Sequence, residues 1–328
     1  MLVAGPNGAG KTNLIEAVHV GTQAFSPRTR ADAQLIRFGC AGARVAIESE
    51  RRGSTISTEV AVVRGEGKRA RLNGAPPTSP DQLRSELPTL VFTPDRLVVV
   101  KGGPGVRRAY VDRALARLFP TRAGLPRAYG EALGQRNACL RKIGLGFSSK
   151  EALAPWSEQV AELGAALQSA RRSEIELLSP RFAEAGEALA LPGCSLEYAA
   201  EPLSAELLER RLARDLERGS TGAGPHLDEV VILGKGHELR SFGSQGEQRT
   251  AVLALLLAEA EVLAERDGGA PLLLLDDVLS ELDMARREAL IERLRGLGQT
   301  IVTATSDTAL PVPADQVVWV SEGTAVTA

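Results

Sequence analysis

The sequence predicts an α/β protein in which both ends of the chain build a mixed sheet with flanking helices, and a helical segment is inserted between them. Three observations predict this. A phosphate-binding loop begins at Gly5, and an apolar strand closed by two carboxylates occupies 271–277. Helical patterns of ordinary length fill much of the middle, at 107–118, 127–142 and 155–178. We expect a head from 1–100 and 223–328, and a helical arm from 101–222.

Composition excludes several classes of protein. The 328 residues are 44% hydrophobic and 24% charged, which suits a folded chain of about two domains rather than a disordered one. Apolar runs all stop short of about 18 residues, so we expect no membrane span and no membrane partner. The three cysteines are too few and too widely spaced for a disulfide framework or a zinc site. A reducing, cytoplasmic location is expected.

The first element is the loop itself. The segment from Gly5 to Thr12 matches the phosphate-loop pattern G-x-x-x-x-G-K-[ST] in full, and all of it is expected to bind nucleotide: Gly5, Pro6, Asn7, Gly8, Ala9, Gly10, Lys11 and Thr12. Glycines let backbone N–H groups close around phosphate oxygens, and a helix expected at 13–20 adds its N-terminal dipole. Lys11 is expected to reach the β and γ phosphates of ATP as a catalytic group, and the Thr12 hydroxyl to bind Mg²⁺.

The strand before the loop is short. A phosphate loop ordinarily follows a buried central strand, and only about three residues precede this one. We therefore expect either that the start codon is misassigned or that the sheet lacks strands. In the second case folding or ATP affinity should suffer.

The segment Pro271–Asp277 is expected to be a buried parallel strand whose carboxyl end meets the ligand. It has the form of a Walker B strand. Asp276 is expected to hold Mg²⁺ directly or through water, and Asp277 to orient or polarise the attacking water as a catalytic residue. The next strand is expected at 299–305, where Thr305, Ser306 and Asp307 occupy the place of a switch histidine that this chain lacks.

A second anion site is expected at Ser244, Gln245 and Gly246, directly before the apolar helix 251–263. Ser244 precedes Asp276 by 32 residues, which is the order and spacing of an ABC-type ATPase signature, and 280–283 fits the D-loop of that class. Lys11 and Ser244 are 233 residues apart. This separation is too large for a transporter ATPase subunit and too small for the long coiled coils of chromosome-maintenance ATPases.

Charge is distributed unevenly. Residues 101–150 contain eleven Lys or Arg and two acids, whereas 251–300 contain five Arg and ten acids. The first segment could attract a polyanion or could be an ordinary solvated face. If its basic residues share one DNA-binding face, Arg107, Arg108 and Arg113 should contribute to the salt dependence of binding.

Several further stretches, in this order, resemble the RecF family, the bacterial recombination mediator ATPases of the ABC class. The resemblance extends over most of the chain and is carried by Gly5–Ala17, Phe25–Arg30, Leu35–Gly39, Phe92–Leu97, Lys101–Pro104, Arg107–Asp112, Gln135–Asn137, Trp156, Gly224–His226, Ser244–Gly246 and Leu275–Asp283. The family usually reads H-R-D-D where this chain has His226–Glu229, and Gln where this chain has Glu247. The family's members also begin with strands that precede the loop, so the chain resembles a member shortened at its N-terminus.

The resemblance implies a function. Two heads would close around two ATP molecules, with Ser244 of one subunit completing the site that Lys11 and Asp276 form in the other. ATP hydrolysis, as a weak DNA-stimulated activity, would release this homodimer. The expected partners are DNA with single-strand gaps or single-strand/duplex junctions, RecR/RecO-like mediators and the RecA recombinase. Two alternatives are a structural or regulatory DNA-binding protein with little ATP turnover and a soluble transporter ATPase subunit.

Smaller signals complete the expectations. Arg28 and Arg30 could contact phosphates or lie in a solvated loop, and Phe92–Asp95 is a better positional candidate for the Q-loop than Gln34 or Gln82. Trp156 and Trp319 are expected in cores, and no metal other than Mg²⁺ is expected.

Overall fold

The computed structural model describes residues 1–29, 31–51, 53–267 and 269–327, which fall into two compact units. Unit 1 comprises Met1–Arg96, Ala188–Ala190 and Val252–Ala328, and unit 2 comprises Leu97–Glu187 and Leu191–Ala251. The head expected from the sequence returned at residue 223, whereas in the structure it returns at Val252. Residues 223–251 belong to unit 2 because strand β7 (Glu229–Gly234) pairs with β6 (Ser195–Ala199) in that unit.

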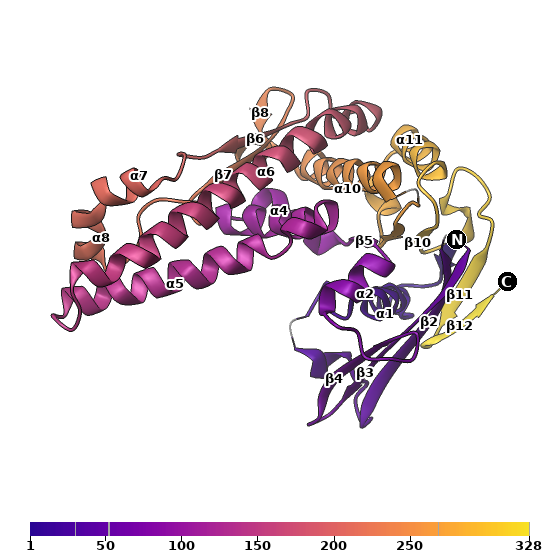
Figure 1. Cartoon of the computed structure of the whole chain (residues 1–328). Helices are drawn as coiled ribbons and strands as arrows, with labels where there is room; N and C mark the ends of the chain where they lie inside the picture. Colours follow the sequence, from indigo (N-terminus) through magenta and orange to yellow (C-terminus); the bar gives the residue numbers. More distant parts are fainter. Residues whose placement is uncertain (30, 52, 268, 328) are drawn as a thin grey trace. The chain divides into compact units, whose positions relative to one another are not determined.

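A six-stranded sheet is the centre of unit 1, with the strand order β12-β11-β1-β10-β9-β5 (Figure 1). Five strands are parallel and β12 runs antiparallel to β11, so the sheet is mixed, as predicted. The strands are β1 (Leu2–Ala4), β5 (Thr89–Phe92), β9 (Leu272–Leu275), β10 (Thr300–Ala304), β11 (Val317–Ser321) and β12 (Thr324–Thr327). The three residues before the phosphate loop thus form a strand with a neighbour on each side, and all three are 0% exposed.

Helix α1 (Lys11–Gln23) packs between this sheet and a second one. The second sheet is an antiparallel meander of β2 (Gly42–Arg51), β3 (Ser54–Val63) and β4 (Gly67–Leu72). Helix and sheet approach closely at Gly21, where a Cβ would lie 2.5 Å from Ile47 Cδ1 and 2.8 Å from Val45 Cγ1. On its other side α1 contacts β5, β9 and β10. The phosphate loop therefore leads into a helix that is fixed on two faces.

The remaining elements of unit 1 are short helices and the end of a long one. They are η1 (Asp32–Leu35), α2 (Pro80–Glu86), η5 (Leu279–Glu281), α11 (Met284–Arg295), η6 (Asp307–Ala309) and the part of α10 (Gln245–Asp267) from Val252 onward; η2 (Pro94–Leu97) lies where the two units join in the chain. Residues 251–260, 262 and 263 of α10 are buried, which confirms the predicted apolar helix.

Unit 2 is mainly helical and includes a small sheet in the order β6-β7-β8. Its long helices α5 (Leu125–Gly144) and α6 (Ala154–Ala188) lie side by side (Figure 1). The other elements are α3 (Val98–Lys101), α4 (Pro104–Leu118), η3 (Pro120–Arg122), η4 (Lys150–Leu153), α7 (Ala205–Arg210), α8 (Leu212–Arg218), β8 (His237–Glu238) and α9 (Leu239–Phe242). The helices predicted at 107–118 and 127–142 are confirmed with slightly wider bounds, and the one predicted at 155–178 continues ten residues further, to Ala188.

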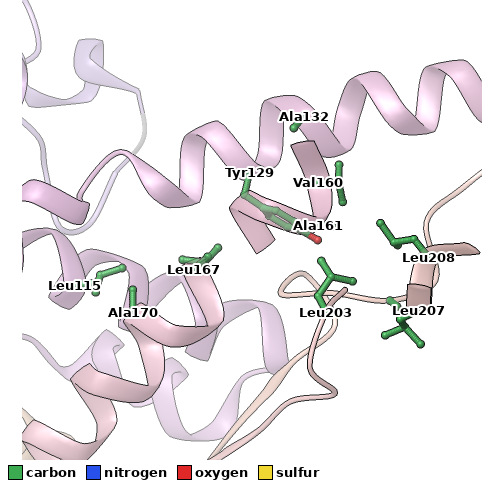
Figure 2. Close-up of a cluster of buried hydrophobic side chains, with 11 residues drawn as sticks. Leu115, Tyr129, Ala132, Val160, Ala161, Leu167, Ala170, Leu203, Leu207 and Leu208 are labelled. Atoms are coloured by element: carbon green, nitrogen blue, oxygen red, sulfur yellow. The ribbon is translucent and has the colours of Figure 1, made fainter. Parts of the chain in front are cut away.

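The main core of unit 2 joins α4, α5, α6 and the segment around α7. Figure 2 shows Tyr129 and Ala132 of α5 facing Val160 and Ala161 of α6, with Leu203, Leu207 and Leu208 on the other side. A smaller core at the end of α5 contains Cys139, Leu140 and Leu153, with Trp156 packed against it as predicted. The prediction for Trp319 is wrong: its side chain is 41% exposed, because it lies on β11 beside the edge strand β12.

Buried polar side chains also hold unit 2 together. His226 Nε2 lies 3.1 Å from the Thr221 carbonyl oxygen, which can only accept, so Nε2 carries the proton and Nδ1 accepts from the Tyr129 hydroxyl at 2.7 Å. Gly224 is required beside this pair, because it has a φ of +124° and its Cβ would lie 2.5 Å from the Tyr129 oxygen. The Gly-Pro-His segment found in the sequence is therefore a packing element of the arm.

Two basic residues of the segment 101–150 belong to this interior. Arg107 is 2% exposed and is paired with Glu229, and Arg136 is 0% exposed with Asp215 at 2.8 Å and the Thr221 hydroxyl at 2.6 Å. Arg108 donates to the Asp228 carbonyl oxygen at 2.6 Å. Buried charges need such partners, and replacing one partner is costly. Whether the basic residues of 101–150 share one DNA-binding face is left open by the sequence, and the buried, paired guanidinium of Arg107 is not part of an exposed face.

Among the described residues, the helices include none that is both long and apolar enough to cross a membrane.

Burial lowers the pKa of His226 below its ordinary value of 6.5, with Arg108 acting in the same direction and Asp228 and Asp215 opposing it. Between the lowered native pKa and pH 6.5 the unfolded chain therefore binds more protons at His226 than the native chain does, and the free energy of unfolding falls as the pH falls through this window. We expect His226→Gln to lose this part of the pH dependence. Urea unfolding of both proteins from about pH 7.5 to about pH 5 measures it. Parallel pH profiles for the two proteins would contradict the assignment.

Candidate nucleotide-binding site

The phosphate loop connects the buried strand β1 to helix α1 within unit 1. Gly5 must be glycine, because its φ is +154° and a Cβ would lie 2.3 Å from the Val320 carbonyl oxygen of β11. Gly10 caps α1 with a φ of +108°, and its carbonyl accepts from the Leu14 N–H at 3.0 Å. The sheet and the helix thus fix both ends of the loop. The predicted nucleotide-binding residues, from Gly5 to Thr12, form one continuous turn before a helix N-terminus, the arrangement that binds phosphate.

Lys11 lies at the start of α1 with its ammonium group directed back over the loop. Its Nζ donates to the carbonyl oxygens of Gly5 at 2.8 Å and Pro6 at 3.0 Å. The ammonium is therefore held at the mouth of the loop, where a phosphate chain cradled by the loop would meet it. Asn13 and Glu16 on the same helix contact Arg28, and the Arg28–Glu16 pair is 3.1 Å long. Arg28 is thus held by an acid of its own unit, and Arg30 lies outside the described residues.

The Walker A and Walker B residues meet across 264 positions of sequence. Thr12 Oγ1 donates to Asp276 Oδ1 at 3.2 Å, and Asp276 is only 3% exposed at the carboxyl end of β9. Its backbone N–H donates to the Phe92 carbonyl oxygen at 2.9 Å, which places the end of β5, the predicted Q-loop position, at the same edge. Thr305–Asp307 follow β10 at this edge, because β10 is parallel to β9. The predicted residues of both motifs therefore converge.

Thr303 is a site residue that sequence reasoning missed. Its hydroxyl donates to Asp276 Oδ1 at 2.8 Å and accepts from the Asp277 N–H at 2.8 Å, so one side chain holds both acids. Asp277 itself has a φ of 51° and is exposed, in contrast to the buried Asp276. The feature that places Thr303 beside the two acids is the register of β10 against β9, in which Val302 is opposite Leu275. That register cannot be obtained from either strand alone.

The oxygen ligands present fit Mg²⁺. A hydroxyl and a buried carboxylate are hard oxygen donors, and an octahedron with bonds of about 2.1 Å has neighbouring ligands about 3 Å apart. Thr12 Oγ1 and Asp276 Oδ1 are 3.2 Å apart, which is close to that edge. No cluster of three or more His, Cys, Asp or Glu able to hold a metal occurs in the part of the chain that the structure describes. A cation at this site would therefore take its other ligands from nucleotide and water.

The segment after Walker B is held by local hydrogen bonds. Ser280 Oγ donates to the Asp277 carbonyl oxygen at 3.0 Å, and Asp283 caps α11 by accepting from the Arg286 N–H at 2.9 Å. The segment predicted as the D-loop is thus an ordered turn between the site and the next helix.

The signature residues lie in unit 2, at the start of α10. Ser244, Gln245 and Gly246 are all exposed. Ser244 Oγ accepts from the Glu247 N–H at 3.2 Å, and Glu247 Oε2 accepts from the Ser244 N–H at 2.8 Å, which is a capping box. The Gln248 N–H bonds to the Ser244 carbonyl oxygen at 3.0 Å. The N–H groups of Gln245 and Gly246 remain as helix-end donors without a helical partner.

The fold and this site define an ATPase head of the ABC/SMC type, with a phosphate loop, a Walker B strand and a signature helix. The model of the family described as "RecF/RecN/SMC N terminal domain" matches residues 1–326. The head of an Smc protein from Pyrococcus furiosus has a TM-score of 0.56 at 18% identity, over 100% of this chain and 89% of that one, and supports the fold alone.

Curated relatives narrow the class. The "DNA replication and repair protein RecF" of Anaeromyxobacter sp. (strain Fw109-5) is 38% identical over 95% of this chain and 88% of its own length, and that of Myxococcus xanthus is 37% identical over 97% and 88%. A solved structure described as the recombination mediator protein RecF-ATP in the RecFOR pathway has a TM-score of 0.85 at 29% identity, covering 100% of this chain and 91% of that one. The chain belongs to the RecF family.

The bridging role of Thr303 gives a test of the site. Thr303→Val keeps the shape and strand propensity of the side chain but removes the hydroxyl that holds Asp276 and the Asp277 N–H. We expect Mg²⁺-dependent ATP affinity to fall by about tenfold, the lower end of the usual cost of losing a partner that orients a metal ligand. Titration with a fluorescent ATP analogue, with and without Mg²⁺, measures it.

Thr300→Val is the matched control, because Thr300 lies on the same strand and its buried hydroxyl has no hydrogen-bond partner among the described residues. We expect Thr300→Val to bind ATP as the parent does. Equal affinities for all three proteins would show that Thr303 does not organise the site.

Proposed function

We propose that this chain is an ATP-dependent DNA-binding protein of replication and recombinational repair. It binds single-strand gaps or junctions of single-stranded and duplex DNA, closes as a dimer around two ATP molecules, and assists RecR/RecO-like mediators in loading the RecA recombinase. The contact between Thr12 and Asp276 carries the nucleotide part of this proposal, because it joins a phosphate loop to a buried magnesium ligand. The ATP-bound RecF structure and the names of the relatives support the remainder.

In this proposal, residues of unit 1 bind the phosphates of ATP, hold Mg²⁺ and orient the attacking water. The backbone of Gly5–Gly10 cradles the phosphates, and Lys11 neutralises charge on the β and γ groups. Mg²⁺, held by Thr12 and Asp276, would supply positive charge to the phosphate oxygens. Asp277, exposed beside the buried acid, orients the attacking water. None of these residues needs a second subunit.

The exposed signature supplies the reason for dimerisation. Gly246 is at the second position of a helix, where alanine would be more stable, and a Cβ built there would meet nothing within 4 Å. Such a glycine leaves room for an incoming group. Phe242, two residues before Ser244, is 76% exposed and is therefore accessible to a second copy. A second copy presenting ATP to Ser244 fits both features, and hydrolysis would then release the pair.

The DNA-binding part of the proposal rests on exposed basic residues at the end of unit 2. Helix α5 ends in a turn where the Phe147 N–H bonds to the Lys142 carbonyl oxygen at 2.8 Å, and Gly146 has a φ of +77°. This turn leaves Leu145 and Phe147 70% and 80% exposed. The basic tip is defined as the exposed residues Arg141, Lys142, Lys150, Arg214 and Arg218 of α5, η4 and α8, with Glu151 and Glu217 as exposed acids nearby in sequence.

Basic groups around an exposed aromatic ring suit DNA that has unpaired bases. Lysine and arginine contact phosphates without regard to sequence, and an aromatic side chain stacks on an unpaired base. The five basic residues of the tip come from α5, η4 and α8, which share the small core of Cys139, Leu140 and Leu153. Their side chains are exposed, and the elements that carry them are held together at this end of unit 2.

Replacing Lys11 tests the whole proposal. Lys11→Met removes the ammonium group at the mouth of the phosphate loop, so we expect ATP-dependent DNA binding to be lost and ATP-independent binding to remain. Fluorescence anisotropy of a gapped duplex, with and without ATP, measures this, and phosphate release is recorded in parallel. Unchanged ATP-dependent binding by the variant would refute the nucleotide-switch function. DNA binding without any phosphate release by the parent would favour the alternative of a structural DNA-binding protein.

Changing the tip tests where DNA binds. We expect Arg141→Ala, Lys142→Ala and Lys150→Ala together to reduce the slope of log affinity against log salt by roughly 2 to 3, about 0.9 for each lost duplex phosphate contact. Phe147→Ala should weaken binding to gapped DNA more than to intact duplex. Arg127→Ala is the control, because Arg127 is on the same helix and pairs with Glu131 at 2.8 Å. A slope that does not change in the triple variant would place the DNA elsewhere.

A further inference from the structure

The signature helix carries a negative charge where its proposed ligand is an anion. Glu247 is the third residue of α10, and its carboxylate accepts from the Ser244 N–H at 2.8 Å. The N-terminus of a helix favours an anion, and here the chain's own carboxylate occupies part of it. A phosphate group approaching Ser244 therefore meets a like charge within one helical turn. Unless it is balanced, this charge opposes the closure proposed above.

Lys235 supplies that balance. Its Nζ donates to Glu247 Oε1 at 2.8 Å, while Oε2 of the same carboxylate holds Ser244. This hydrogen bond from Lys235, followed by that from the Ser244 N–H, lowers the pKa of Glu247 to about 2. Glu247 is therefore ionised at every pH at which the protein works, and its charge is neutralised by the lysine rather than by a proton.

The backbone at Lys235 indicates that the side chain is there for a reason other than folding. Lys235 and Gly236 form the two-residue turn between β7 and β8, with φ values of 51° and 77°. Both central residues of such a turn are left-handed, and asparagine or glycine is strongly preferred at the first. Lysine is disfavoured there. The ion pair that Lys235 makes with Glu247 adds little to stability, because both side chains are partly exposed to solvent, 48% for Lys235 and 24% for Glu247.

The same hydrogen bonds define the donors of this turn. Ser244 Oγ accepts from the Glu247 N–H at 3.2 Å, and the Ser244 side chain also hydrogen-bonds to the Glu247 carboxylate and helps to lower its pKa. The N–H groups of Gln245 and Gly246 are adjacent helix-end donors. With Glu247 fixed by Lys235, these groups belong to a turn whose local charge is balanced.

We propose that Lys235 is a positioning residue of ATP-dependent closure: it neutralises and fixes Glu247 so that the phosphate of an ATP bound to a second copy can approach Ser244, Gln245 and Gly246. This inference rests on the nucleotide-bridged dimer proposed above. Lys235 lies outside the phosphate loop, the Walker B strand and the signature. Its ammonium group balances the negative charge of Glu247, which would otherwise repel the phosphate.

Four variants of the full chain test the proposal: Lys235→Asn, Lys235→Arg, Glu247→Gln and the double variant Lys235→Asn with Glu247→Gln. Asparagine tolerates the left-handed turn, so Lys235→Asn should unfold at the same temperature as the parent or above it. It leaves the charge of Glu247 unbalanced at both sites of a dimer. We expect the dimer dissociation constant, measured by light scattering with a non-hydrolysable ATP analogue and Mg²⁺, to rise by about tenfold per site and about a hundredfold in all.

Rescue separates a charge effect from a structural one. Glu247→Gln removes the charge, so we expect it to dimerise at least as well as the parent, and the double variant to return to within about threefold of the parent. Lys235→Arg should stay close to the parent. ATP binding by each monomer, followed with a fluorescent analogue, should not change because the phosphate loop is untouched.

The outcomes are distinguishable. If the parent closes with nucleotide and Lys235→Asn closes equally well, the role of Lys235 is refuted while the proposed function survives. If Lys235→Asn is impaired and the double variant is not rescued, Lys235 acts through structure and the proposal also fails. If the parent itself does not dimerise with nucleotide, the proposed nucleotide-bridged dimer is refuted, and the role of Lys235 is refuted with it.

Discussion

A buried carboxylate at the carboxyl end of a central strand is the constraint on which unit 1 depends. Asp276 is 3% exposed, and taking an ionised group out of water is costly unless hydrogen bonds or a cation repay it. Thr12 and Thr303 supply the hydrogen bonds from α1 and from β10. These two contacts join α1 and β10 to the end of β9 at one edge of the sheet. The phosphate loop, which ends at Thr12, is positioned by the same contacts.

Unit 2 also buries charged and polar side chains, and it pairs them with each other. Its interior contains arginines paired with acids, and the histidine and tyrosine that bridge α5 to the segment before β7. These contacts bring residues 223–251, and with them the signature, into the arm unit. The Walker residues and the signature residues of one chain therefore lie in separate compact units. Such a division is compatible with the nucleotide-bridged dimer proposed above.

The sequence predicted the parts of this protein that depend on local spacing. The strand, turn and helix around Gly5–Thr12, the buried strand before Asp276 and the helices of the arm are local patterns, and each is confirmed as a structural element. Thr303 could not be predicted, because its role follows from the pairing of two strands that are 24 residues or more apart in the chain. The sequence also did not predict which basic residues of 101–150 are buried. Arg107 and Arg136 are buried and pair with acids more than 75 positions away in the chain. Trp319 is exposed because its strand lies next to the edge of the sheet.

The central claim is that ATP joins two copies of this chain. The most direct measurement is the solution mass of the purified protein, by light scattering after gel filtration, with Mg²⁺ and with or without a slowly hydrolysed ATP analogue. The account predicts a monomer that becomes a dimer only when both nucleotide and Mg²⁺ are present. The same mass under all conditions, at protein concentrations well above those used for DNA binding, would contradict it.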